Sequence, residues 1–307
     1  MSDRDNGVRR VVEGKNGLMV YDPENNPKVV DAVNEIRNKF LVEFEANPQL
    51  YIENDLKLIK SNDYFIRRFL YPHDLDPKPA YEQFRTWMQW RKDIGFEDKG
   101  DHRFPMEFFQ IGALFTYRQD KQGTRILYMR FKVYKKLDIL VEPIQRFVVY
   151  NMNKLDELGG RERSWAVLFD TRGAGIAQVD FDMLIFLVKT VKQYYPWGLK
   201  YVAIYELPWL LQGAWKITQN VLPEDATRLF KFYDRNSIKE LIDVKDLPDF
   251  MDGECTDDYR AVPDGCQPAE VIGQKELGLS SQDVKKVIKH FEKHLKDFNQ
   301  NSVCVKD

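Results

Sequence analysis

The segment from Tyr194 to Phe230 carries the clearest pattern of apolar and polar positions in the chain. It predicts a helix that ends at Pro196, a buried strand over Lys200–Leu207, and a second helix that begins after Pro208. Apolar residues recur at helical spacing in the second helix, and further apolar residues flank that stripe. We therefore expect this helix to contact apolar groups on two sides. The stripe consists of Leu210, Ala214, Ile217 and Val221, and it is flanked by Trp209, Leu211 and Trp215.

Two interpretations of this second helix remain open on periodicity alone. It is either an ordinary buried helix of a large core or a movable cover over an apolar ligand pocket. Apolar spacing reports that a helix face is covered but does not report what covers it.

Other segments alternate between strand patterns and helix patterns. Residues 125–134 and 164–170 predict strands, whereas 141–158 and 180–195 predict helices, the first of them ended by Gly159 and Gly160. Strands that alternate with helices favour βαβ units. We therefore predict an α/β fold class with a mixed, largely parallel sheet.

The N-terminal region differs from this alternating region. Residues 1–27 are polar and predict a flexible arm, and residues 28–100 predict a small helical lobe. One helix of the lobe ends at Asn47-Pro48, and another begins at Pro77. Residues 101–255 then form the larger lobe, and 256–307 form a polar loop and a C-terminal amphipathic helix.

The C-terminal helix has an apolar face and a basic face. Ser280 and Asp283 predict its N-terminal cap, and its apolar stripe includes Val284, Val287 and Phe291. The basic face is either a solvated surface on a docked helix or a contact for an anionic membrane. That face carries Lys285, Lys286, Lys289, Lys293 and Lys296.

Composition narrows the class of protein. The chain has 307 residues, of which 43% are hydrophobic, so it can bury one substantial core and a smaller lobe. A formal net charge of -2 provides no basic footprint for nucleic acid. The cysteines Cys255, Cys266 and Cys304 do not suggest a disulfide framework, and no segment reaches the roughly 18 apolar residues of a membrane span. We expect a cytoplasmic protein, peripheral on an internal membrane.

Enzyme motifs are absent or incomplete. The chain has no G-x-x-x-x-G-K-[ST] phosphate loop and no G-x-S-x-G elbow, and Gly173-Ala174-Gly175 lacks the third glycine of a dinucleotide turn. Arg172 stands where a second acid would help Asp170 to hold a metal. His290 and His294 share a helix face, but no third ligand is suggested. We predict no catalytic residue, no metal and no cofactor.

A series of motifs in a fixed order resembles the CRAL-TRIO family of lipid-binding domains. The resemblance covers about Tyr64 to Gly253, and its most specific part is the order of elements from Tyr194 to Asp225. The matching motifs are Arg68-Phe69-Leu70, Trp90-Arg91-Lys92, Asp120–Gly123, Trp165–Asp170, Tyr194-Tyr195-Pro196, Leu207-Pro208-Trp209, Glu224-Asp225, Leu247-Pro248 and Gly253.

The resemblance implies a container for a hydrophobic molecule. It predicts an N-terminal helical lobe, a sheet that forms the floor of an apolar pocket, and a helical gate. The implied function is to bind a lipid and to exchange or present it at a transient membrane contact, without covalent chemistry. The alternative is a membrane-associated adaptor or small-GTPase regulatory module that uses the same fold.

The residues predicted to line the pocket come from strands and helices. Alternation along a strand places every second side chain on one face, which selects the floor. Helical spacing selects the wall in 180–195 and the gate in 209–221. For each residue, plain core packing is the competing interpretation. The floor is Leu127, Met129, Phe131, Trp165, Val167, Phe169 and Ile204, the wall is Leu184, Val188 and Val191, and the gate is Leu210, Ala214, Trp215 and Ile217.

The positions that read lipid headgroups in the family differ here. The resemblance implies that inositol-binding members carry a basic pair, a Glu and a Lys, and that choline-lipid binders carry a Ser and a Thr. Apolar or sign-reversed groups in their place predict a ligand with a small or weakly polar head, or one whose head stays at the surface. The basic pair falls on His73 and Asp74, the Glu on Trp197, and the Lys on Arg228 or Leu229. The Ser and the Thr fall on Trp165 and Val167.

Overall fold

The structure is a computed structural model that describes residues 12–13, 19–20, 26–95, 100–158, 165–222 and 224–303. The chain divides into two compact units. The helical unit contains the described residues of 1–98 together with Leu187–Lys200, and the sheet unit contains those of 99–159, Trp165–Phe186 and 201–307. Each unit is described below by itself.

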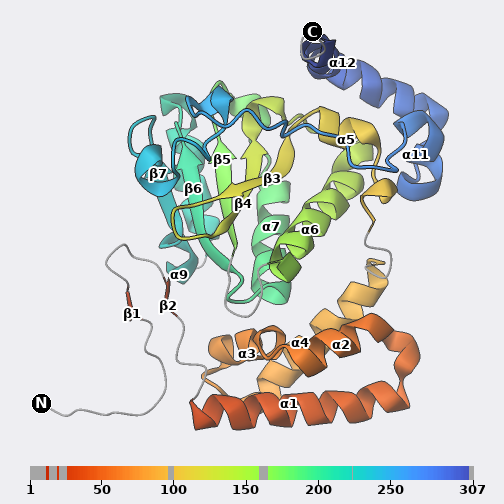
Figure 1. Cartoon of the computed structure of the whole chain (residues 1–307), viewed down its shortest axis with the longest axis vertical. Helices are drawn as coiled ribbons and strands as arrows, with labels where there is room; N and C mark the ends of the chain where they lie inside the picture. The colour runs from red at the N-terminus through yellow and green to blue at the C-terminus, as the bar shows by residue number, and fades with distance from the viewer. Residues whose placement is uncertain are drawn as a thin grey trace, which may run out of the picture. The chain divides into compact units, whose positions relative to one another are not determined.

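Four helices of the described residues lie entirely within the helical unit (Figure 1). They are α1 (Pro27–Ala46), α2 (Glu53–Ser61), α3 (Tyr64–Leu70) and α4 (Pro77–Asp93). The side chains of Asn26 and Asp76 accept hydrogen bonds from backbone N–H groups at the starts of α1 and α4, each of which has proline in its first turn. The predicted helices after Asn26 and at Pro77 are confirmed.

A buried arginine lies at the centre of this unit. The side chain of Arg68 on α3 is fully buried, and its guanidinium lies 4.5 Å from the centre of the Trp87 ring. It also donates a hydrogen bond to the carbonyl of Tyr194 at 3.3 Å. The cation is stabilised by the faces of surrounding rings, so it holds the segment 194–195 against α3. The other rings near the guanidinium belong to Tyr64, Phe65, Phe69 and Tyr195.

A second buried charge in the helical unit is paired. Arg91 on α4 donates to both carboxylate oxygens of Asp55 on α2, at 2.7 and 2.9 Å. The two side chains are 0% and 1% exposed. Two parallel hydrogen bonds are the strongest geometry for this kind of pair. The pair therefore joins α2 to α4 within the core.

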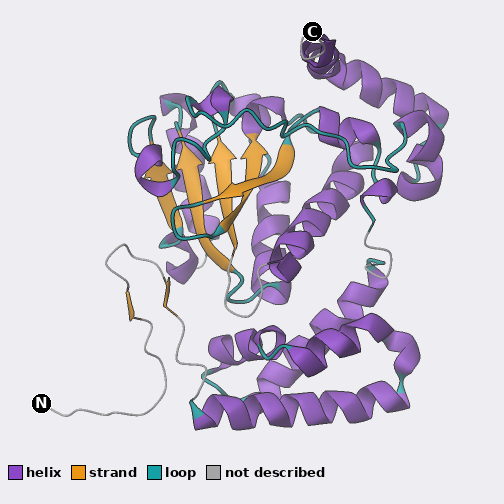
Figure 2. Ribbon diagram, viewed as in Figure 1, coloured by secondary structure: helices purple, strands orange, loops and turns teal. Residues whose placement is uncertain are grey.

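The sheet unit is built on five strands in the order β3-β4-β5-β6-β7. β3 runs antiparallel to β4, whereas β4 with β5 and β6 with β7 are parallel (Figure 2). The predicted α/β class with a mixed, largely parallel sheet is confirmed. The strands are β3 (Leu114–Gln119), β4 (Arg125–Arg130), β5 (Trp165–Asp170), β6 (Leu199–Tyr205) and β7 (Phe230–Tyr233).

The parallel strands follow one another in sequence and are joined by helices. Right-handed crossovers between strands in sequential order place their helices on the same face of the sheet. The connecting helices are α6 (Val141–Leu158), α7 (Phe181–Tyr194), and α8 (Gln212–Val221) with α9 (Glu224–Thr227). The shorter α5 (Met106–Gln110) precedes β3, and α10 (Ile238–Leu241) follows β7.

Two short segments differ from the predicted elements. The strand expected over 125–134 ends at Arg130, because Phe131–Val133 form a 3-10 turn. The N-terminal arm contains a two-stranded antiparallel pair, β1 (Val12–Glu13) with β2 (Met19–Val20). The rest of that arm before Asn26, the glycines Gly159 and Gly160, and Cys304 lie outside the described residues.

The C-terminal helices complete the sheet unit. α12 (Ser281–Val303) follows α11 (Ala269–Leu277), and Ser280 and Asp283 cap it reciprocally. Val284, Val287 and Phe291 are buried in a cluster with residues such as Ile111, Val133 and Leu140. The apolar stripe is therefore docked, while all five predicted lysines of the basic face are exposed. Within the described ranges, no helix is both long enough and apolar enough to cross a membrane.

We expect the Asp55–Arg91 pair to be essential for the stability of the helical unit. Asp55→Asn leaves a buried guanidinium without its charged partner and should lower the free energy of unfolding by about 3–5 kcal/mol. Urea denaturation followed by circular dichroism measures the change. The matched control is Asp63→Asn, which removes a pair with Arg37 in which the aspartate is 57% exposed and should cost less than about 1 kcal/mol. Equal losses in the two variants would contradict the assignment.

Candidate functional site

The predicted floor residues share one face of the sheet. Leu127 lies opposite Val167 and Met129 opposite Phe169 in the β4–β5 register. The N–H of Thr171 donates to the carbonyl of Tyr205 at 3.1 Å, which continues the parallel register and places Ile204 beside Phe169. Trp165 lies on the same face, two residues before Val167. Phe131 follows the end of β4, and its ring centre is 5.1 Å from that of Phe169.

This face is buried at one end of the strands and accessible at the other. In β4, β5 and β7, the exposure of the apolar side chains on this face rises towards the carboxyl end, whereas on β6 Val202 and Ile204 are both buried and Lys200 before them is half-buried. The face therefore presents apolar surface that the protein itself does not fully cover. The exposed fractions are 0% and 9% for Leu127 and Met129 on β4, and 1% and 3% for Trp165 and Val167 on β5. They are 4% and 7% for Val202 and Ile204 on β6, and 48% for Phe232 on β7. Phe131, Phe169 and Phe230 are half-buried.

The predicted gate helix lies against the edge of this face. The ring centre of Trp215 on α8 is 5.1 Å from those of Phe230 and Phe232 on β7. Ala214 is half-buried. The other side of the segment is exposed: Leu210 is 42% and Ile217 is 52% accessible. The expectation of apolar contacts on two sides is therefore wrong for the described residues, because β7 is the last strand of the described sheet and the outer side of this segment is exposed.

Trp209 is the most exposed large apolar residue of the described chain. It lies in the 3-10 turn Trp209–Leu211 that leads into α8, and 81% of it is accessible. A tryptophan exposed to this extent gives up the hydrophobic stabilisation that its ring would gain from burial. Its position directly before the gate makes it part of the candidate site.

The predicted wall residues lie on α7. Leu184, Val188 and Val191 are spaced by four and three residues, so they share a face of the helix. All three are half-buried, and the one fully buried residue of this apolar helix is Thr190. Val188 and Val191 belong to the helical unit. Their place relative to the sheet stays a prediction.

The opposite face of the sheet is a filled core. Leu168 and Tyr128, which are neighbours in the β4–β5 register, are fully buried. The ring of Phe115 on β3 stacks on Tyr128 at 5.3 Å and contacts Tyr259 at 4.6 Å. Tyr259 comes from the segment after β7, which therefore covers this face. The two faces thus differ in kind, one packed with aromatic side chains and the other open at its carboxyl end.

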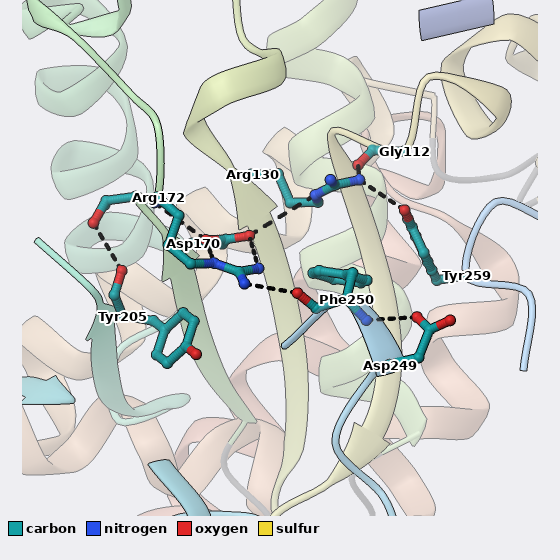
Figure 3. A network of polar contacts seen from close by, with 9 residues as sticks. Gly112, Arg130, Asp170, Arg172, Tyr205, Asp249, Phe250 and Tyr259 are labelled. Carbon is teal, nitrogen blue, oxygen red and sulfur yellow. Dashed lines mark hydrogen bonds and ion pairs between the residues drawn. The ribbon is translucent and has the colours of Figure 1, made fainter. Parts of the chain in front are cut away.

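A network of polar contacts lies at the carboxyl ends of β4 and β5 (Figure 3). The carboxylate of Asp170 accepts two hydrogen bonds from the Arg172 guanidinium, each 2.9 Å long, and a third from the Arg172 backbone N–H at 3.2 Å. It also lies 3.9 Å from Nε of Arg130. Arg172 also donates to the carbonyl of Phe250 at 2.6 Å. Asp170 is only 5% exposed, so its charge is neutralised within the protein.

The same network reaches the segment after β7. Arg130 donates to the hydroxyl of Tyr259 at 2.8 Å, and its guanidinium lies 4.6 Å from the centre of the Phe250 ring. The hydroxyl of Thr171 donates to the carbonyl of Tyr205 at 2.8 Å. These contacts fix the position at which the chain leaves β6 towards the gate. Sequence analysis missed this role, although an aspartate at a strand end with an arginine two residues on is a signal for such a pair.

A cleft of about 730 Å³ lies at the same edge. Its lining comes from the segments that follow β5, β6 and β7, and it includes Ile204 and Phe232 of the apolar face. Sequence analysis did not predict this cleft, because three loops that are far apart in sequence form it.

The residues at the family's headgroup positions make contacts of their own. His73 shares a hydrogen bond with Gln83 at 2.9 Å, and the ring of Trp197 packs against Tyr71 at 4.7 Å. Trp165 and Val167 are buried. Among the described residues, no group of three or more His, Cys, Asp or Glu side chains is arranged to hold a metal ion.

Comparison with known proteins finds a similarity over part of the chain. Residues 110–253 match the model of the CRAL/TRIO domain. The crystal structure of Sfh5 superposes with a TM-score of 0.60 at 10% identity, and the match covers 83% of this chain and 99% of Sfh5. Residues 110–253 are therefore similar to the CRAL/TRIO domain, in agreement with the resemblance of the sequence motifs, and the fold is similar to that of Sfh5.

Two curated relatives show how far the similarity extends. CRAL-TRIO domain-containing protein C3H8.02 of Schizosaccharomyces pombe is 26% identical over 55% of this chain, which spans 40% of that protein. Phosphatidylinositol transfer protein CSR1 of Eremothecium gossypii is 22% identical over 94% of this chain and 72% of its own length.

We expect the two faces of β5 to respond differently to truncation. Leu168→Ala should lower the free energy of unfolding by about 2–5 kcal/mol, because it opens a cavity in a filled core. Phe169→Ala should cost at most about 2 kcal/mol, because its half-buried ring already contacts solvent. Thermal and urea unfolding of the two variants measure the difference. A loss for Phe169→Ala as large as that for Leu168→Ala would show that the open face is packed core.

Proposed function

We propose that this protein binds a lipid on the apolar face of its sheet and exchanges it with membranes, without catalysis. The observation that carries the proposal is the rise in exposure along this face towards the carboxyl ends of the strands. A continuous apolar surface that is buried at one end and open at the other suits a long hydrocarbon chain, each methylene of which gains about 0.8 kcal/mol on burial. The name of the Eremothecium gossypii relative, a phosphatidylinositol transfer protein, supports this class of ligand.

Mass spectrometry of an organic extract of the purified protein tests the proposal directly. A stoichiometric lipid is the expected result. Protein that is free of lipid, and that takes up none from vesicles, would instead favour the alternative of an adaptor or small-GTPase regulatory module with a filled cavity.

The gate segment supplies the contact with the membrane. Trp209 and Leu210 are exposed, and tryptophan is favoured at the interface between lipid and water. The exposed lysine face of α12 adds a second contact if the surface is anionic, each lysine near it contributing about 1 kcal/mol. Both contacts are peripheral, in agreement with the expected location of the protein at an internal membrane.

We expect charge on the gate to reduce membrane docking. Trp209→Asp and Leu210→Asp should each weaken vesicle binding by about tenfold or more and slow lipid transfer. Each variant loses about 1.5 kcal/mol or more of apolar burial in the membrane, and the new negative charge opposes insertion. Vesicle sedimentation and transfer of a fluorescent lipid measure the two effects. Val42→Asp is the control, because Val42 is 70% exposed on α1 of the helical unit. Unchanged transfer in both gate variants would refute the gate.

The proposal also includes a ligand class. His73, Asp74, Trp197, Trp165 and Val167 replace the groups by which family members read inositol or choline lipids, as the resemblance implies. We therefore propose that the protein does not bind the inositol ring specifically.

The motifs Ile111-Gly112, Phe169-Asp170 and Leu207-Pro208-Trp209 further resemble the CRAL-TRIO domain of motile sperm domain-containing protein 2, to which we propose that this domain is most similar.

We expect phosphatidylinositol to have no advantage as a ligand. In a competition assay with labelled phosphatidylinositol, phosphatidylcholine and a sterol, the inositol lipid should be displaced at least as readily as the other two. The reason is that His73 and Asp74 stand in place of the basic pair at the family's inositol positions, as the resemblance implies. Tight and selective phosphatidylinositol exchange, as the name of the Eremothecium gossypii relative states for that protein, would contradict the expectation.

A further inference from the structure

Glu206 has a strained backbone at the point where the chain leaves β6 for the gate. Its φ is 54°, in the left-handed region, which is unfavourable for a residue that carries a Cβ. It directly follows β6 and stands three residues before the exposed Trp209. Such backbone conformations persist only where neighbouring contacts hold them, and they are concentrated at sites that switch between two arrangements.

Local structure explains the other positive φ angles of non-glycine residues in the described chain, but not that of Glu206. Four of these residues lie in turns that follow a helix or a 3-10 turn, where the left-handed conformation is common. A fifth lies at the irregularity in the β3–β4 register. Glu206 instead ends a regular parallel strand. The other five are Asp74, Leu75, Trp197 and Asp252 in the turns, and Arg118 at the irregularity.

Two hydrogen bonds hold Glu206 against the end of β7. Its backbone N–H donates to the carbonyl of Tyr233 at 2.8 Å, which is the last bond between β6 and β7. Its carboxylate accepts a hydrogen bond from the backbone N–H of Arg235 at 3.0 Å. The side-chain bond can form only while the backbone turns in this direction, so it stabilises the strained conformation.

The loop that supplies the Arg235 N–H is itself well ordered. The carboxylate of Asp234 accepts hydrogen bonds from the N–H groups of Asn236 and Ser237, at 2.9 and 2.8 Å, and from the Ser237 hydroxyl at 2.9 Å. An aspartate that bonds to the backbone two and three residues further on fixes a tight turn. The Arg235 N–H is therefore a fixed point to which Glu206 attaches the start of the gate.

The two residues after Glu206 have little conformational freedom. The ring of Pro208 fixes its own φ, and its backbone is extended. Leu207 precedes a proline, which disfavours the helical region for its backbone. Rotation about the backbone of Glu206 is therefore the simplest way to change the direction in which the gate leaves the sheet.

We propose that Glu206 is a strained latch of the gate. Its carboxylate, through the Arg235 N–H, keeps the backbone in the left-handed region, and opening of this bond lets the backbone relax and carries residues 209–221 away from β7. The bond is exposed, so water can replace either partner. The inference rests on the proposed lipid binding. Insertion of Trp209 into a membrane acts three residues from the latch and favours its opening.

Three substitutions of Glu206 separate the bond from the strain. Hydrogen–deuterium exchange of the full chain, measured in peptides from residues 207–221, reports opening of the gate. Glu206→Gln keeps an oxygen acceptor at the same length and should exchange within about twofold of the unmodified protein. Glu206→Ala loses the bond but keeps the strain, so exchange should be about threefold faster or more. Glu206→Gly also loses the bond, but without a Cβ it is not strained, so its rate should lie between the other two.

This order of rates distinguishes a latch from a flexible connection. Flexibility alone predicts the fastest exchange for Glu206→Gly, because glycine has the greatest backbone freedom. A rate for Glu206→Gly equal to or above that of Glu206→Ala would therefore overturn the strained latch. Exchange in Glu206→Gln as fast as in Glu206→Ala would show that the hydrogen bond holds nothing, with the same consequence.

Glu240→Ala is the matched control. Glu240 is exposed on α10, which follows the same loop, so this variant removes an equal charge close to the latch. Exchange in residues 207–221 should stay at the rate of the unmodified protein. An increase equal to that of Glu206→Ala would assign the effect to charge and overturn the inference.

Release of a bound lipid connects the latch to the proposed function. The protein is loaded with fluorescent phosphatidylcholine or a fluorescent sterol, and its release to vesicles is followed. Glu206→Ala should release the lipid about threefold faster or more, and Glu206→Gln at the unmodified rate. Faster deuterium exchange with unchanged release would overturn the role of Glu206 in gating. An unmodified protein that takes up neither lipid would refute lipid binding itself, whereas the order of exchange rates would still decide whether the latch exists.

Discussion

The alternation of side chains along the parallel strands is the constraint on which the sheet unit depends. Each strand must supply one set of residues to a core and another set to the opposite face. Here the residues around Tyr128 and Leu168 are packed beneath the segment after β7. The second face is buried at Leu127, Trp165 and Val167 but only half-buried at Phe131 and Phe169. A face that is only partly covered is what a hydrophobic ligand would need in order to enter and leave the proposed site.

The Asp170–Arg172 pair stabilises the loops at the carboxyl edge of the sheet. Three loops leave the strands there, and loops without regular hydrogen bonding need other contacts to hold a shape. The pair and its neighbours Arg130 and Tyr259 provide these contacts through charged hydrogen bonds and aromatic rings. The start of the segment that leads into α8 is thereby attached to the sheet edge, while one side of that segment is exposed at Leu210 and Ile217.

Sequence alone predicted the elements that depend on local spacing. The helix over Val141–Leu158, the cap at Ser280 and the floor strands follow from periodicity and from short motifs. The exposed side of α8 was not predictable, because periodicity does not reveal that β7 is the edge of the sheet. The cleft and the Arg172 network also escaped prediction, since they depend on loops brought together by the order of the strands. Arg68 was assigned only to a family motif, and its aromatic surroundings required the fold.

The chain does not complete the helical unit before it begins the sheet unit. Leu187–Lys200 returns to the helical unit, and in doing so it divides α7 between the two and takes the first residues of β6 with it. Neither unit is thus a continuous stretch of sequence. A deletion of the first hundred residues would remove the partners of Tyr194 and Tyr195 while leaving both aromatic residues in place. Any continuous segment that includes all of the described sheet unit therefore also carries Leu187–Lys200 of the helical unit.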